Sequence, residues 1–202
     1  MIYWLVIFPV GFMIIVITIA LLVGRRDRKK MAEQQEEKRK DLLLTNPRRA
    51  VVEEITRIKE FSDYVFHDIK INKEQIECLF ISRKGIFVIK ALNNEGVISG
   101  EINAEHWINQ IDQEFVLKNP LIDNKRGLDA VSNILNQKFG LFNMIVLTKA
   151  KQINLLGNDN DVVLYSELEK TFSGLPNIFS ENDLMVFYNG IDNHLNAHAF
   201  DD

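Results

Sequence analysis

Two ionisable side chains stand inside neighbouring apolar runs and are the first candidates for chemistry. Glu77 lies in the run QIECLFIS and Lys90 in the run GIFVIKAL, with a short turn at residues 83–85 between them. Short apolar runs joined in this way are typical of an antiparallel β-hairpin. The hairpin would make Glu77 and Lys90 face each other, so we expect a salt bridge between them. An ammonium group in that place also repels metal ions strongly where the effective dielectric constant is low.

Other motifs that carry chemistry are absent from the sequence, which has no serine-based triad, phosphate-binding glycine loop or dinucleotide-binding fingerprint. Cys78 is the only cysteine, so no disulfide can form within the chain. Its alternation with Glu77 predicts that it faces the core as an unreactive packing residue. Trp107 and Phe115 could stack on nucleic-acid bases, although aromatic residues between strands more often belong to the core.

The strands that would position these residues are short and lie in the middle of the chain. We expect strands in YVFHDIKIN, in both arms of the hairpin, in VISGEI and around Trp107, with a turn at residues 93–96. LFNMIVLT and DVVLY are continuous apolar runs, typical of strands that are buried on both faces. These segments predict one mixed β-sheet.

Helices are predicted on either side of this strand-rich region. One begins at Asn46-Pro47 and carries apolar residues at helical spacing, namely Val51, Ile55, Ile58 and Phe61. Another follows Pro120, and two more begin at Ser166 and Ser180, with Asp183 placed as the capping-box partner of Ser180. The order of elements predicts an α+β domain, a mixed sheet flanked by helices.

The N-terminal segment is predicted to be a transmembrane helix. Residues 2–23 contain no charged side chain, and fifteen of these 22 residues are Ile, Leu, Val or Phe. As a helix they span about 33 Å, against about 30 Å of hydrocarbon in a bilayer. A cleavable signal peptide would need positive charge before the apolar run and a shorter core, whereas here the basic residues follow it. Because Lys/Arg-rich flanks stay in the cytoplasm, we expect a single-pass protein of the inner membrane with its N-terminus outside.

Charge is unevenly distributed along the chain. The formal net charge is −4, but residues 25–40 carry eight basic and four acidic side chains, which leaves −8 for the remainder. A domain with that balance is a poor non-specific binder of phosphate backbones.

From the apolar segment, the charged segment and the predicted helices and strands, we divide the chain into four parts. These are a membrane anchor (1–24), a charged stalk (25–46), a domain (47–178) and a C-terminal helix with a polar tail (179–202).

Residues 75–124 contain a series of short motifs in a fixed order: QIE at 75–77, GIFVIKALNN at 85–94, GVISG at 96–100, Trp107 and NPLIDN at 119–124. The series resembles the nuclease-related domain (NERD) family of bacterial proteins. The pattern of that family has a QID strand, then G-x-F-V-I-E-x-K-N, G-x-I-x-G, a tryptophan, and N-P-x-x-Q-N at a helix start. The residues that match the pattern are Gln75, Gly85, Asn93, Gly96, Gly100, Trp107, Asn119, Pro120 and Asn124.

The resemblance implies a restriction-endonuclease-like fold, in which two carboxylates hold Mg²⁺ or Mn²⁺ and a lysine assists the attacking water. Glu77 stands at the place of the family's aspartate, but Lys90 replaces the glutamate and Leu92 replaces the lysine. Asp123 replaces a glutamine. We therefore expect Glu77 and Lys90 to be remnants of a catalytic site, and no metal cofactor.

Three hypotheses about function follow from these observations. The preferred hypothesis is a non-catalytic binding or scaffolding module, held at the membrane by residues 2–23, whose partner is a protein or nucleic acid. The alternative is a Mg²⁺- or Mn²⁺-dependent nuclease in which Lys90 serves as the lysine and Glu77 is the first metal ligand. The second carboxylate would then come from Glu53, Glu54, Asp68, Glu95 or Glu101. In a third hypothesis, the N-terminal helix and stalk oligomerise the protein.

Overall fold

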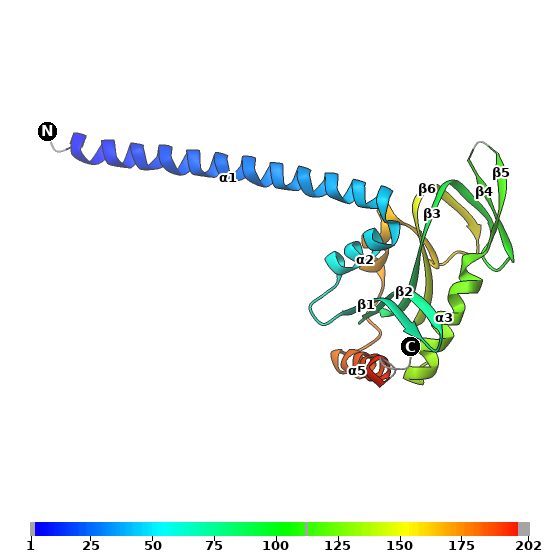
Figure 1. Cartoon of the computed structure of the whole chain (residues 1–202). Coiled ribbons are helices and arrows are strands. Elements are labelled where there is room, and N and C mark those ends of the chain that lie inside the picture. The colour runs from blue at the N-terminus through cyan, green and yellow to red at the C-terminus, as the bar shows by residue number, and fades with distance from the viewer. Residues whose placement is uncertain (1–2, 112, 198–202) are drawn as a thin grey trace. The chain divides into compact units, whose positions relative to one another are not determined.

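The structure, a computed structural model, describes the backbone of residues 3–111 and 113–197, and side chains in these ranges from residue 24 onward. The chain forms two compact units, Met1–Thr45 and Asn46–Asp202, and each is described by itself. The first unit is one helix, α1 (Tyr3–Thr45), which is unbroken at Gly24 (Figure 1). Past Gly24 its polar side chains are exposed and include the pairs Lys29–Glu33 and Lys40–Glu36.

Among the helices whose side chains the structure describes, none is long and apolar enough to cross a membrane. The transmembrane segment predicted at residues 2–23 lies outside that described set. The stalk predicted after it is helical, as part of α1.

The second unit is an α+β domain built on one seven-stranded mixed sheet (Figure 1). Its elements are α2 (Pro47–Ile58), β1 (Tyr64–Ile71), β2 (Glu74–Ser82), β3 (Gly85–Glu101), β4 (His106–Gln110), β5 (Glu114–Lys118), α3 (Pro120–Leu135), β6 (Leu141–Leu156), β7 (Val162–Leu164), a 3₁₀ turn (Tyr165–Glu167), α4 (Leu168–Gly174) and α5 (Glu181–Ala197). The mixed sheet flanked by helices confirms the fold class predicted from the order of elements.

Strand β3 is the centre of the sheet. Its first half pairs antiparallel with β2, and its second half with β4. Along its other edge it runs parallel to β6. Strand β1 lies outside β2, β5 outside β4, and β7 outside β6. The expected β2–β3 hairpin is confirmed, with Cys78 opposite Ile89.

The turn predicted at residues 93–96 is absent, because β3 continues through it as one strand. The pairing of β3 with β6 shifts register between Leu92 and Glu95 and again between Gly96 and Val97. Gly96 has a φ of +84°, a left-handed conformation that glycine adopts without strain. The glycine therefore makes an irregularity in a long strand, not the end of one.

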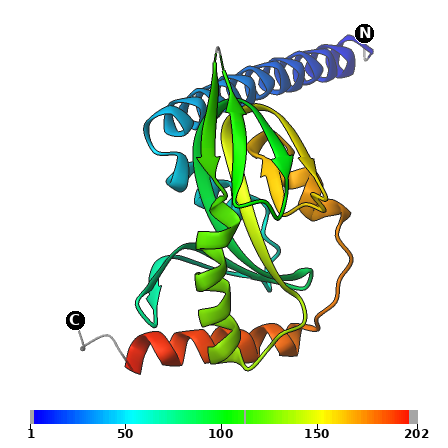
Figure 2. The ribbon, with the colours of Figure 1, turned by 90° about the vertical axis from the view of Figure 1, so that its right-hand side faces the viewer.

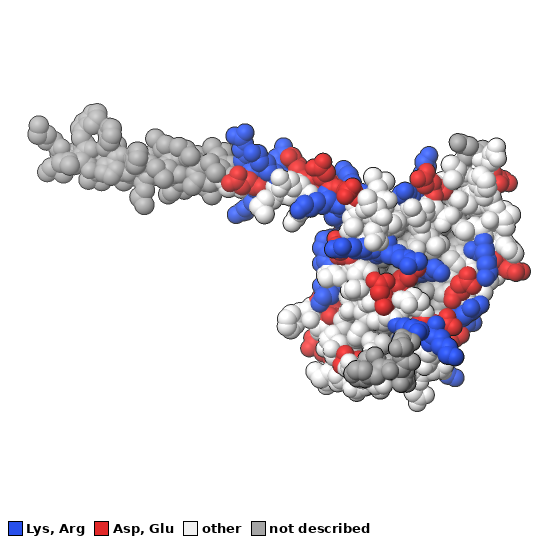
Figure 3. All heavy atoms as spheres, in the orientation of Figure 1, with Lys and Arg blue, Asp and Glu red and all other residues white. Residues whose placement is uncertain are grey.

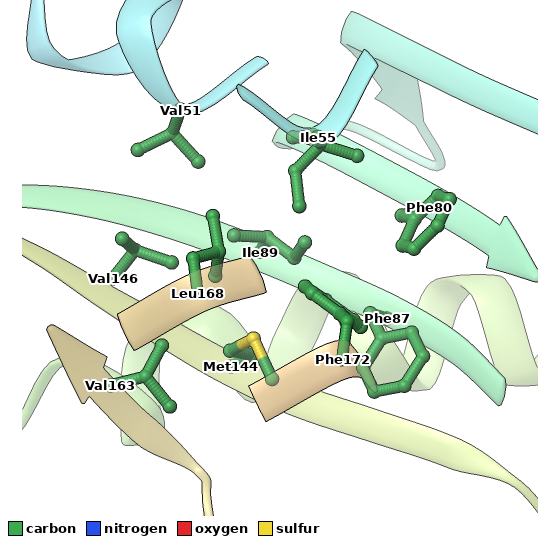
Figure 4. Close-up of a cluster of buried hydrophobic side chains, with 11 residues drawn as sticks. Val51, Ile55, Phe80, Phe87, Ile89, Met144, Val146, Val163, Leu168 and Phe172 are labelled. Atoms are coloured by element: carbon green, nitrogen blue, oxygen red, sulfur yellow. The ribbon is translucent and has the colours of Figure 1, made fainter. Parts of the chain in front are cut away.

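Helices cover both faces of the sheet. On one face, Val51 and Ile55 of α2 and Leu168 and Phe172 of α4 pack against the sheet at Ile89 and its neighbours (Figure 4). On the other face lie α3 and α5 (Figure 2). The apolar residues of α5 that pack there are Leu184, Phe187 and Ile191.

The helix ends follow the local sequence signals with two exceptions. The helix expected from Ser166 starts instead at Leu168, after a 3₁₀ turn and without a side-chain cap. Ser180 and Asp183 form the predicted capping box, in which the backbone N–H of Ser180 donates to the Asp183 carboxylate at 2.8 Å and that of Asp183 donates to Ser180 Oγ at 3.3 Å. The prediction that Phe61 lies on the first helix of the domain was wrong. Helix α2 ends at Ile58, where Lys59 takes an extended conformation, and Phe61 is fully exposed.

Asn119 joins the β4–β5 hairpin to α3. Its side-chain amide donates to the carbonyl oxygens of Ile102, at 2.8 Å, and Ala104, at 2.7 Å. Its side-chain oxygen accepts from the N–H of Leu121 at 3.0 Å and caps α3. The residue is buried, so water cannot replace these partners when the side chain is removed.

We expect Asn119→Ala to lower the free energy of unfolding by about 3 kcal/mol, because it removes a helix cap and the donor to one buried and one partly buried carbonyl group. Asn119→Asp keeps the capping oxygen and loses the two donors, so it separates the two contributions. Asn196→Ala, which removes one exposed hydrogen bond to Asp192, is the matched control with an effect within about 0.5 kcal/mol. Thermal unfolding followed by tryptophan fluorescence measures all three; equal effects of N119A and N196A would contradict the assignment.

Candidate functional site

The carboxylate of Glu77 has both of its oxygens occupied by the protein itself. Oε1 lies 3.2 Å from Nε of Arg48, and Oε2 accepts a hydrogen bond from the backbone N–H of Ala91 at 3.0 Å. The Glu77 side chain is only 10% exposed. Its ionised form is therefore balanced by a guanidinium group on one side and a peptide dipole on the other.

The expected salt bridge between Glu77 and Lys90 is not among the ion pairs of the described residues, and Arg48 takes that role. The β2–β3 register places Cys78 opposite Ile89, which brings Lys90 and the N–H of Ala91 next to Glu77. The cation that contacts Glu77, however, is Arg48, which lies outside the hairpin on the first turn of α2. Sequence reasoning missed Arg48 because no local pattern tells which strand a helix terminus will approach.

Local backbone features place Arg48 at this position. The side chain of Asn46 accepts from the N–H of Arg49 at 3.1 Å, and Pro47 fills the first helical position of α2. The helix is then held on the sheet by Val51 and Ile55, which are buried in the core. These contacts fix the start of α2 near β2 and leave Arg48 free to reach Glu77.

Lys90 and Glu77 line the same small cavity of about 180 Å³, together with Arg48, Asp123 and Asn124. Asp123 is the second acid of this cavity, and its carboxylate is 2.9 Å from Nζ of Lys118. The hydrogen bond from Lys118, with a further contribution from the charge of Lys90, lowers the pKa of Asp123. Glu74 also lines the cavity. Of its three carboxylates, those of Glu77 and Asp123 are already paired with cations.

Five other acids were candidates for the second metal-ligating carboxylate, and four of them contact a basic side chain. Glu53 bonds Arg49 at 3.0 Å and Glu54 bonds Arg57 at 2.7 Å. The remaining three are Asp68, 3.4 Å from His67, Glu95, 3.8 Å from Lys149, and Glu101, which is exposed at the end of β3. Within the described part of the chain, no group of three or more His, Cys, Asp or Glu side chains is arranged to hold a metal ion.

The donor set around Glu77 does not fit a divalent metal ion. Mg²⁺ and Mn²⁺ require several oxygen ligands that converge on one point. In this cavity Glu77 already contacts Arg48 and Asp123 already contacts Lys118. Lys90 adds a further positive charge to the wall. Leu92, at the position of the family's lysine, packs with the core around Trp107. We therefore derive no metal-dependent step from these residues.

A larger groove of about 980 Å³ runs between α2 and β1. Its walls alternate in charge, since Arg48, Arg49 and Arg57 lie among Glu53, Asp68 and Glu77. Figure 3 likewise shows basic and acidic side chains next to one another on this face of the domain, without a field of one sign. Such a surface suits a polar partner better than a phosphate backbone, which requires a basic stripe.

The aromatic candidates have different positions in the fold. Trp107 is fully buried, and its Nε1–H donates to the carbonyl of Glu101 at 3.0 Å. It is therefore a core residue that cannot stack on a base. Phe115 is 53% exposed on β5, so the common assignment of such aromatics to the core is wrong for this residue.

The other residues that match the family pattern hold the backbone in place. A side chain at Gly85 would collide with the Phe142 ring, and one at Gly96 with the carbonyl of Gln110. Asn124 donates to the Val88 carbonyl at 2.9 Å and to the Asn143 side chain at 2.7 Å. The rest are Asn93, whose side-chain oxygen is 3.4 Å from Oγ1 of Thr148, Gly100, which lies against Trp107, Pro120 at the start of α3, and Gln75, exposed on β2.

Cys78 is buried in the core beside α2, as its alternation with Glu77 predicted. Burial raises the pKa of its thiol to about 12. The thiolate, which is the reactive form, is therefore scarce at neutral pH. The prediction of an unreactive packing residue agrees with this environment.

Comparisons with known proteins extend the resemblance seen in the motifs. A family model described as "Nuclease-related domain" matches residues 36–148, which is more than half of the chain. An uncharacterized protein of Bacillus anthracis is 24% identical over 144 residues, covering 67% of this chain and 68% of that protein. No solved structure matches the chain. The family match, together with the placement of the motif residues around β3, shows that this chain belongs to the nuclease-related domain family.

Proposed function

We propose that this protein is a membrane-anchored, non-catalytic binding module that uses a restriction-endonuclease-like fold as a scaffold. The observation that carries the proposal is the state of Glu77, whose two oxygens are held by Arg48 and the N–H of Ala91. A carboxylate that ligates a metal ion needs free lone pairs and neighbouring oxygen donors. At this position the protein supplies cations instead.

The groove between α2 and β1 is the proposed binding surface for a partner. The groove is large enough for a peptide segment, and its alternating charges favour a partner with both acidic and basic side chains. The net charge of −8 outside residues 25–40 disfavours non-specific attachment to nucleic acid. A cytoplasmic protein partner is therefore preferred over DNA or RNA.

We expect no metal-dependent cleavage of DNA by the full chain in detergent with Mg²⁺ or Mn²⁺, measured on supercoiled and linear substrates. The matched variants are Glu77→Ala and Glu77→Gln, of which the second retains an acceptor for the Ala91 N–H. All three proteins should show the same background. Cleavage by the wild type that disappears in both variants, while their thermal unfolding is unchanged, would overturn the proposal in favour of a nuclease with relocated ligands.

A variant designed to gain metal binding tests the same physical reasoning. Arg48→Ala combined with Lys90→Glu removes the guanidinium group from Glu77 and replaces the lysine of the cavity with a further carboxylate. We expect 1 mM Mn²⁺ to raise the melting temperature of this double variant by about 3 °C. The control, Arg48→Ala with Lys90→Gln, and the wild type should not respond; an equal shift in the wild type would show that the native site already accepts the ion.

The membrane anchor is supported by the composition of residues 2–23 and by the basic residues that follow them. An uncharged segment of this length is stable in a bilayer. The basic residues Arg25, Arg26, Arg28, Lys29 and Lys30 would keep the following unit on the cytoplasmic side of the inner membrane.

A reporter fused after Asp202 tests the topology. Alkaline phosphatase should be inactive and green fluorescent protein fluorescent, because both fusions would lie in the cytoplasm. Deletion of residues 2–23 should move the protein from the membrane fraction to the soluble fraction. A phosphatase fusion that is active, or a truncated protein that stays in the membrane after alkaline extraction, would contradict this arrangement.

A further inference from the structure

Three strands of the sheet have a strand neighbour on one side alone in the described part of the chain: β1, β5 and β7. Free strand edges tend to pair with other strands, and proteins usually protect them with short length, bulges or charges. Strand β7 has three residues. Strand β1 is interrupted at Asp68, which has a φ of +51° and no partner in the β1–β2 register. Strand β5 is uninterrupted and longer than β7, and its only charges, Glu114 and Lys118, stand at its two ends.

Strand β5 is regular, and its middle is apolar. All five of its residues pair in register with β4, from Lys118 opposite His106 to Glu114 opposite Gln110. Between these charged ends, Phe115 is 53% exposed and Val116 is 71% exposed. No proline, bulge or central charge prevents another strand from adding to this edge.

The hydrogen bonds of the β4–β5 hairpin show which backbone groups face outward. The N–H of Asn119 donates to the carbonyl of Glu105 at 2.9 Å, and that of Ile111 donates to the carbonyl of Gln113 at 3.3 Å. Hydrogen-bonded pairs alternate along an antiparallel ladder, so Phe115 and Leu117 direct their N–H and C=O groups toward β4. The N–H and C=O groups of Glu114, Val116 and Lys118 therefore point away from the sheet.

We propose that β5 pairs antiparallel with β5 of a second copy of this chain, about a two-fold axis at Val116. In this register Val116 meets Val116 of the second copy. At each end, Glu114 of one copy meets Lys118 of the other. The five-residue strand is thus self-complementary in charge, in shape and in its free backbone groups, as an isologous interface requires.

Competing arrangements match less of the strand. A parallel pair in register would place Glu114 beside Glu114 and Lys118 beside Lys118, which is destabilising. Shifting the two-fold axis by one residue leaves part of the strand unpaired. Lys118 already contacts Asp123, but an ammonium group has three donors and can bond a second carboxylate.

The pairing forms about six backbone hydrogen bonds, from three pairs of outward-facing residues. An interface of that size is smaller than the standard stable interface of about 1,600 Å², so the pair is weak in dilute solution. Attachment of both copies to one membrane, which is part of the proposed function, would raise their effective concentration. The register itself does not depend on the anchor.

Disulfide cross-linking tests the register directly. In full-length Val116→Cys, two cysteines meet at the two-fold axis at a Cα separation of about 5.5 Å, within the range of a disulfide. The native Cys78 is buried and does not interfere. Val186→Cys is the matched control, because Val186 is 67% exposed on α5. After mild oxidation we expect at least tenfold more cross-linked dimer for V116C than for V186C; equal or absent cross-linking would overturn the proposal.

Charge exchange supplies an independent readout. In the V116C background, Glu114→Lys places lysines opposite Lys118 of the second copy and should reduce cross-linking several-fold. The exchange Glu114→Lys with Lys118→Glu restores opposite charges and should recover most of the cross-linked dimer. Cross-linking that is insensitive to E114K, or that stays low in the exchanged variant, would overturn the antiparallel register. Nuclease activity, if found, would leave these results unchanged, so failure here is distinguishable from failure of the proposed function.

Discussion

The contact between Arg48 and Glu77 is the interaction on which the candidate site depends. A carboxylate that is only 10% exposed has to be compensated, because an unpaired charge at such a place loses much of its hydration. A metal ion could provide the compensation, and so could a guanidinium group with a peptide N–H. The chain uses the second solution, and a guanidinium group at Glu77 disfavours a metal ion there because like charges repel. Lys90 and Leu92 stand at the positions of the family's glutamate and lysine. They are consistent with compensation of Glu77 by Arg48, because neither side chain supplies an oxygen donor.

Local sequence patterns predicted those parts of the fold that local interactions determine. The β2–β3 hairpin follows from two apolar runs and a short turn, and the capping box at Ser180 follows from residue types three positions apart. The position of Phe61 could not be predicted in this way, because it fits the helical spacing but the chain leaves α2 at Lys59. Likewise, Asn93 to Gly96 has the composition of a turn. The long parallel ladder with β6 keeps that segment extended, and a ladder between residues about 55 positions apart leaves no local signal.

The candidate site shows the same division. Glu77 and Lys90 were correctly placed side by side because both belong to one hairpin. The partner of Glu77 was not found because Arg48 comes from a helix whose docking depends on Val51, Ile55 and the whole core of that face. The side-chain geometry of a site thus depends on tertiary packing that is absent from any short window. Sequence patterns identified the acid, and the structure identified the cation that neutralises it.

The matched family residues explain why membership of the family does not by itself imply an activity. Gly96 permits the irregularity in β3, Trp107 fills the core beneath the second half of that strand, and Asn119 joins the β4–β5 hairpin to α3. Each would be required whether or not a metal ion is held at Glu77, because each stabilises the backbone and none faces the cavity there. These three residues therefore report a fold, whereas Gln75 and Asn124 line the cavity beside Glu77. Fold alone does not determine function. Selection on such a scaffold can then act on its surfaces, among which the regular, apolar edge of β5 is the one that the domain leaves unprotected.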